Sequence, residues 1–83
     1  MQAVLFRREL LRRFKVGEEL GVPTVDINAG DIHRAVGGYP SSDHRMATCC
    51  DVIYAEQGPN DQIIAQPPKR KGASLTIRFA LPR

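Results

Sequence analysis

Three consecutive cations, Lys69, Arg70 and Lys71, stand near the end of the chain between two short apolar runs. A Pro-Pro dipeptide precedes them and Gly72 follows, which is typical of a turn or loop. Positive charges gathered on a loop attract a phosphate backbone, but they do not distinguish one nucleotide sequence from another. The pattern predicts a loop with a basic tip that binds phosphates. A solvated charged loop that keeps an exposed hairpin soluble is the alternative.

A second group of polar side chains lies where we expect a helix to begin. Ser41, Ser42 and Asp43 are good N-cap residues, so a helix is predicted from about Asp43 to Gln57. Helix N-terminal amides favour a phosphate, and an arginine there can form a bidentate pair with guanine. Asp43 and Asp51 put negative charge near the same face and count against such contacts. The side chains that we expect to contact phosphates or bases are Ser42, His44, Arg45 and Thr48.

The cysteines and histidines invite a metal or hydrolytic interpretation. Cys49 and Cys50 are adjacent and lack the gap of a zinc site, so we expect two reduced thiols that pack a helix. Four other residues flank the predicted turn and would suit metal-assisted phosphodiester hydrolysis if they converged: Asp31, His33, Asp43 and His44. Nothing in the sequence fixes their geometry, and no phosphate-binding glycine loop or H-E-x-x-H motif is present. We therefore expect no catalytic residue, no metal site and no cofactor.

The elements that position these side chains follow from apolar periodicity. An amphipathic helix is predicted over about Val4 to Leu20, and the β-branched run Thr24–Ile27 predicts a short strand. Asn28 is the expected N-cap of a second helix of about two turns, which the string Gly37-Gly38-Tyr39-Pro40 ends. In the third helix the residues expected to be buried recur at helical spacing: Met46, Cys49, Cys50 and Ile53.

The end of the chain predicts a β-hairpin around the basic loop. Its arms are the apolar runs 62–66 and 74–79. In the second arm Leu75, Ile77 and Phe79 alternate with polar or small residues, so one face of that strand is expected to be buried.

This order of helix, strand, helix, turn, helix, strand, basic loop and strand resembles the winged helix-turn-helix family over almost the whole chain. The resemblance implies an α+β fold, with three helices and a small antiparallel sheet. It also implies that the third helix enters the DNA major groove and that the hairpin loop, the wing, touches the backbone. The wing would be Pro67–Gly72. The string Gly37-Gly38-Tyr39-Pro40, followed by His44-Arg45-Met46 and Cys49-Cys50, is also similar to small uncharacterised bacterial proteins, a likeness that indicates no activity.

The length of the chain agrees with one small domain over residues 1–83. The net charge of +3 is modest, but the cations cluster near the two ends of the chain, which fits an acidic partner. No apolar run approaches the length of a membrane span, and adjacent cysteines cannot staple the fold. We therefore expect a cytoplasmic protein with no membrane partner.

Taken together, the sequence predicts a DNA-binding winged helix-turn-helix protein, either a transcription regulator or a DNA-docking subunit. Its expected partner is double-stranded DNA, and its assembly would be a homodimer or a larger protein complex. Two alternatives stay open: a protein–protein interaction module on the same scaffold, and, less favoured, a small metal-dependent nuclease.

Overall fold

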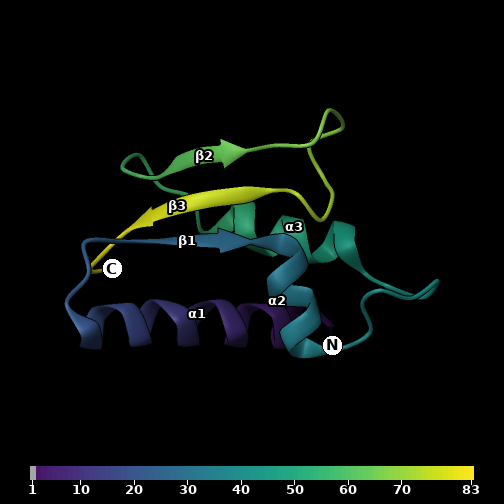
Figure 1. Cartoon of the computed structure of the whole chain (residues 1–83), viewed down its shortest axis with the longest axis horizontal. Helices are drawn as coiled ribbons and strands as arrows, with labels where there is room; N and C mark the ends of the chain where they lie inside the picture. The colour runs from purple at the N-terminus through teal and green to yellow at the C-terminus, as the bar shows by residue number, and fades with distance from the viewer. Residues whose placement is uncertain (1) are drawn as a thin grey trace.

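The computed structural model describes residues 2–83, which form three helices and a three-stranded antiparallel sheet (Figure 1). The chain is thus a small α+β domain. The elements follow one another as α1 (Gln2–Leu20), β1 (Thr24–Asn28), α2 (Ala29–Val36), α3 (Met46–Ala55), β2 (Gln62–Ala65) and β3 (Thr76–Ala80).

Helix α1 buries one narrow stripe of side chains. Phe6, Leu10 and Phe14 recur every four residues and are almost completely buried, as the periodicity predicts. The same periodicity places three more residues on this stripe, but they are exposed: Ala3, Leu11 and Leu20. Gly17 continues the stripe because its backbone lies close to the C-terminal segment. A Cβ atom at this position would lie 2.7 Å from Leu81 Cδ1. The C-terminal half of α1 is therefore packed tightly against the end of the chain.

The sheet has the strand order β1-β3-β2, so the last strand of the chain lies in its centre. Both neighbours run antiparallel to β3, with Ile27 opposite Ile77 on one side and Ile63 opposite the same residue on the other. The β2 ladder shifts its register between Ile63 and Ala65. Leu75, Ile77 and Phe79 are fully buried, which confirms the predicted alternation.

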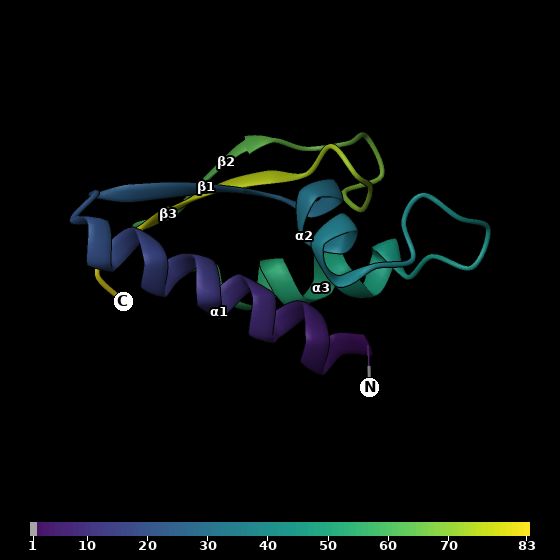
Figure 2. The same cartoon turned by 60° about the horizontal axis from the view of Figure 1, so that its bottom comes forward.

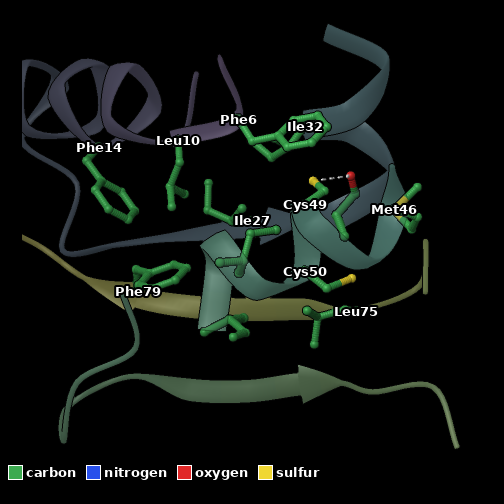
Figure 3. Packing of buried hydrophobic residues seen from close by; sticks show 13 residues of the cluster. Phe6, Leu10, Phe14, Ile27, Ile32, Met46, Cys49, Cys50, Leu75 and Phe79 are labelled. Atoms are coloured by element: carbon green, nitrogen blue, oxygen red, sulfur yellow. Dashed lines mark hydrogen bonds between the residues drawn. The ribbon is translucent and has the colours of Figure 1, made fainter. Parts of the chain in front are cut away.

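The helices lie on one side of this sheet and enclose the core between the two layers (Figure 2). Figure 3 shows that the core is aliphatic and aromatic, with the two cysteine thiols among the packed side chains. Among residues 2–83, no helix has the length and apolar character that a bilayer crossing requires.

The sequence predicts N-cap residues for two helices, and the structure agrees with one of them. Asn28 caps α2, because its side-chain oxygen accepts the Asp31 amide at 3.0 Å. The prediction that the third helix begins near Asp43 is wrong, since α3 begins at Met46. Ser41 forms a local turn instead: its hydroxyl donates to the Gly38 carbonyl at 2.8 Å and accepts the Asp43 amide at 3.2 Å.

Candidate nucleic-acid interface

The two groups of predicted contact residues lie at the same end of the molecule. The loop of residues 37–45 and the loop between β2 and β3 both project from the end where α3 begins, as Figures 1 and 2 show. This end thus presents a helix start between two exposed loops. The loop of residues 66–75 is called the wing loop below.

The start of α3 is capped by two histidines rather than by a serine or an aspartate. The N-cap residue Arg45 has no side-chain capping bond. Its own amide donates instead to His33 Nε2 at 2.9 Å, and the Met46 amide donates to His44 Nδ1 at 3.2 Å. His33 comes from α2 and is buried, so the histidine cap joins α2 to α3. To accept these bonds, His33 Nε2 and His44 Nδ1 must each carry no proton.

An aromatic cluster surrounds the histidine cap. The His33 ring lies 4.8 Å from Phe6 and 5.5 Å from Tyr39 between centroids, and the His44 ring packs edge-on against Tyr39 at 5.7 Å. His33 Nδ1 is buried among these rings and has no hydrogen-bond partner among the described residues. The cluster fixes the position of the preceding loop, because it anchors the loop at Tyr39 and again at His44.

Three of the predicted contact residues precede α3 and are exposed: Ser42, His44 and Arg45. The expectation that Ser42 lies at the start of the helix and that His44 and Arg45 lie in its first turn is therefore wrong, because the helix begins one residue after Arg45. Only Thr48 lies on α3 itself, and it is half-buried. His44 turns Nδ1 toward the backbone, which leaves Nε2 for an external partner. The Arg45 guanidinium donates a long bond, 3.4 Å, to the Asp43 carbonyl.

The wing loop is held against α3 by several contacts. Lys71 forms an ion pair with Asp51 at 2.7 Å. The Tyr54 hydroxyl donates to the Arg70 carbonyl at 2.5 Å, and the Arg70 guanidinium lies over the Tyr54 ring. Cys50 Sγ donates to the Gly72 carbonyl at 3.4 Å. The wing loop is therefore a supported structure and not a free hairpin tip.

Arg70 adopts a left-handed backbone conformation, with φ of 72°. Only glycine and, less often, asparagine or aspartate adopt it readily. The Arg70 amide donates to the Pro67 carbonyl at 2.8 Å, which closes a tight turn at the tip. Together with the Tyr54 contacts, this turn holds Lys69 and Arg70 at the surface, where both side chains are exposed.

The charge at this end is uneven. The negative charge of Asp51, which counts against DNA contacts, is neutralised by Lys71. One cation of the basic triplet therefore pairs within the protein. Arg34 is paired with Asp31 at 2.9 Å. Within residues 2–83, the cations here without a carboxylate partner are Arg45, Lys69 and Arg70. The exposed positions of α3 between the two loops are nearly neutral: Ala47, Asp51 and Ala55.

The cations of α1 are mostly paired on a different surface. Glu9 accepts hydrogen bonds from Arg12 and from Arg13, the second of which is an i,i+4 pair on the helix surface. The bonds from Arg12, and then those from Arg13, outweigh partial burial and lower the pKa of Glu9 to about 2. Arg7 pairs with Glu56 at the end of α3.

The cysteines behave as packing residues. Burial raises the pKa of the Cys49 thiol to about 12, and its Sγ lies 3.5 Å from the Ala29 carbonyl (Figure 3). The pKa of Cys50 is also raised by burial. Among residues 2–83, no three histidine, cysteine or acidic side chains gather as a metal would need. His33 and His44 do converge, but Asp31 is engaged with Arg34.

Two structural features of this end are not predicted from the sequence. The first is the histidine cap, since a histidine on a neighbouring helix leaves no local signal at the start of α3. The second is the role of Tyr54, whose hydroxyl also accepts a bond from Gln66 at 2.9 Å. In the sequence, this role of Tyr54 is indicated only by its spacing, because Tyr54 follows Asp51 by three residues and therefore lies on the same helix face.

The chain matches no protein-family model, no curated protein and no solved structure at a significant level.

Proposed function

We propose that this protein binds double-stranded DNA as a winged helix-turn-helix domain, with the start of α3 toward the major groove and the wing loop on the phosphate backbone. The observation that carries the proposal is the position of the free cations. Arg45 lies on one side of the start of α3, and Lys69 and Arg70 lie on the supported wing loop at the same end. The strand order β1-β3-β2 after an α-β-α-α-β-β chain is compatible with this architecture.

The proposed contacts divide into phosphate binding and base reading. Lys69 and Arg70 supply charge to the backbone and read no sequence. Arg45 is the residue suited to guanine, while Ser42, Thr48 and His44 Nε2 offer shorter-range hydrogen bonds. Because α3 is nearly neutral between the loops, we expect backbone contacts to supply most of the affinity. A regulator of this kind would act as a homodimer on paired half-sites, whereas a docking subunit would not need to.

Salt dependence tests the proposal. Each phosphate contact contributes a slope of about −0.9 in log K against log salt, so the two wing-loop cations that bind the backbone give about −1.8. The double variant Lys69→Ala/Arg70→Ala should reduce the slope by about 1.8, since two contacts are lost. Binding is measured by fluorescence anisotropy with a pool of random-sequence duplexes.

The matched control changes the same charge elsewhere. Arg8→Ala/Lys15→Ala removes two exposed α1 cations that have no carboxylate partner within residues 2–83. This variant should keep the slope of the unmodified protein. No binding to the duplex pool at low salt, or an equal loss in both double variants, would contradict DNA binding by the wing loop.

The near-neutral surface of α3 favours a second candidate function, a protein–protein interaction module on the same scaffold. Ala47 and Ala55 leave that surface flat and uncharged, and Asp51 is already neutralised. In this case an Ala47→Glu substitution would disrupt a protein contact, while Lys69→Ala/Arg70→Ala would leave it intact. Co-purification of a defined partner with the unmodified chain, lost only in Ala47→Glu, would favour this function over DNA binding.

A further inference from the structure

Within residues 2–83, the backbone groups at the outer edge of β1 have no backbone partner. β1 has a single neighbour, β3, and the pairs Leu81 N to Pro23 O and Ala29 N to Leu75 O, both 2.9 Å, fix which backbone groups point inward. Since an antiparallel ladder alternates, Val25 and Ile27 bond to β3 in the same register. The amides and carbonyls of Thr24 and Asp26 are therefore directed outward.

An apolar groove of about 270 Å³ lies next to this edge, between β1 and the C-terminal half of α1. Gly17 and Val25 line it beside three apolar side chains that are unusually exposed: Leu20 at 74 %, Val16 at 40 % and Val22 at 39 %. Arg12 and Arg13 stand at one end. Apolar side chains that gather around a groove mark a site of interaction more often than isolated ones do.

Helix α1 is placed so that an added strand would lie over this groove. In both views α1 runs along the β1 side of the sheet, opposite β2, and Figure 2 shows it below the sheet layer. A strand that continued the sheet beyond β1 would thus extend above α1. Because side chains of a strand alternate between its two faces, every second one would point into the groove.

We infer that the β1 edge binds an extended peptide by strand addition, with alternate apolar side chains against Val16, Leu20 and Val22 and an acidic residue near Arg12 and Arg13. Main-chain hydrogen bonds to Thr24 and Asp26 would supply affinity, and the groove would supply specificity. This inference is independent of the proposed DNA binding, since it uses a different face of the protein.

Charge indicates where the acidic residue of the peptide belongs. Arg12 and Arg13 share the single carboxylate of Glu9, so this cluster keeps one net positive charge. Asp26 adds no free negative charge at the edge, because it is paired with Arg78 at 2.8 Å. Since α1 and β1 run in opposite directions along the groove, the arginines lie toward the end of β1, where an antiparallel peptide would begin. The acidic residue is therefore the first of the peptide.

A second copy of the chain fits this edge less well than a single strand. Pairing of β1 with β1 of another copy would bring the α1 helix of that copy beneath this sheet. That layer is already filled by α3, which packs against α1 (Figure 2). A lone extended segment brings no helix with it.

The test is a phage-displayed library of the pattern Asp-Thr-x-Thr-x-Thr-x, in which x runs through Val, Ile, Leu and Phe, so that Asp and every x lie on the same face of the strand. Selection uses the full chain, with counter-selection on a Leu20→Lys variant. We expect enriched peptides whose affinity for Leu20→Lys is weaker by at least about tenfold. Val4→Lys is the matched control, because Val4 is 58 % exposed on another face of the same helix. It should bind like the unmodified protein.

Two further measurements test whether the peptide pairs with the β1 backbone and where it lies. N-methylation of alternate backbone amides in an enriched peptide should abolish binding, and NMR shifts should concentrate at residues 16–26. If no peptide is enriched, or if Leu20→Lys and Val4→Lys bind equally, the inference is wrong. A concentration-dependent dimer that Leu20→Lys dissociates in analytical ultracentrifugation would assign the groove to a second copy instead.

Discussion

Asp61 shows how one buried carboxylate can organise the end of a fold. Its side chain is 1 % exposed and accepts the Gly58 amide at 2.7 Å, the Ala80 amide at 2.8 Å and the Arg83 guanidinium at 2.9 Å. Burial alone would raise the pKa of Asp61, but the backbone bonds from Ala80 and Gly58 and then the interaction with Arg83 outweigh it. The net effect is a pKa below the ordinary value of 3.8.

The lowered pKa of Asp61 predicts a loss of stability in acid. A carboxylate whose pKa is lower in the folded state stabilises it fully above the ordinary value, and this contribution is lost as pH falls through the folded value. Asp61→Asn should therefore reduce the free energy of unfolding by about 1–3 kcal/mol near neutral pH, and the difference from the unmodified protein should shrink below about pH 4. Urea unfolding of both proteins near neutral pH and below about pH 4 measures this difference in the free energy of unfolding. A difference that does not change with pH would contradict the lowered pKa of Asp61.

At the scale of elements, the start of α3 depends on a bond from another helix. His33→Phe keeps an aromatic ring in the cluster but removes the acceptor of the Arg45 amide. The bond that is lost is part-buried and such a bond contributes about 0.5–1.5 kcal/mol, so we expect a loss of that size in urea unfolding and faster hydrogen exchange in residues 45–48. His44→Ala is the control: because His44 is exposed, water can replace its bond, and the loss should stay below about 0.5 kcal/mol. Equal stability of His33→Phe and the unmodified protein would contradict the cap.

The same helix shows what the sequence can and cannot predict about elements. Asn28 and the alternation of Leu75, Ile77 and Phe79 are local signals, and the structure confirms both. The prediction places the start of α3 too early, because the Ser41 hydroxyl bonds within a local turn and accepts the Asp43 amide, while the amide at the helix start donates to His33 of α2. Likewise, the basic triplet predicts a loop but not its support, since the Lys71–Asp51 pair and the Tyr54 bond join segments far apart in sequence.

At the scale of the molecule, three-dimensional placement decides which charges are available. The sequence shows clustered cations, yet most of those on α1 face a carboxylate, whereas Arg45, Lys69 and Arg70 are free at one end. Strand order had a similar effect, because placing β3 in the centre leaves β1 as an open edge beside an apolar groove. Neither property is a sum of local preferences, so neither could be predicted from periodicity or composition.

Arg83 joins the sheet, α1 and the end of α3, so its removal should act on the whole molecule. Its guanidinium lies 5.0 Å from the rings of Phe14 and Phe79 and donates to Asp61 and to the Glu56 carbonyl at 2.6 Å. Arg83→Ala leaves the buried Asp61 carboxylate with one partner fewer, so we expect a cooperative loss of about 1–3 kcal/mol in thermal and urea unfolding.

Arg78→Ala provides the comparison for Arg83→Ala. It breaks an ion pair with Asp26 in which both side chains are nearly half exposed, and such pairs contribute at most about 1 kcal/mol. The double variant Asp61→Asn/Arg83→Ala should lose less than the sum of the two single losses, because the two residues share one interaction. Strict additivity in that cycle, or equal losses for Arg83→Ala and Arg78→Ala, would show that Arg83 does not join these elements, and that Asp61 is held by the Gly58 and Ala80 amides alone.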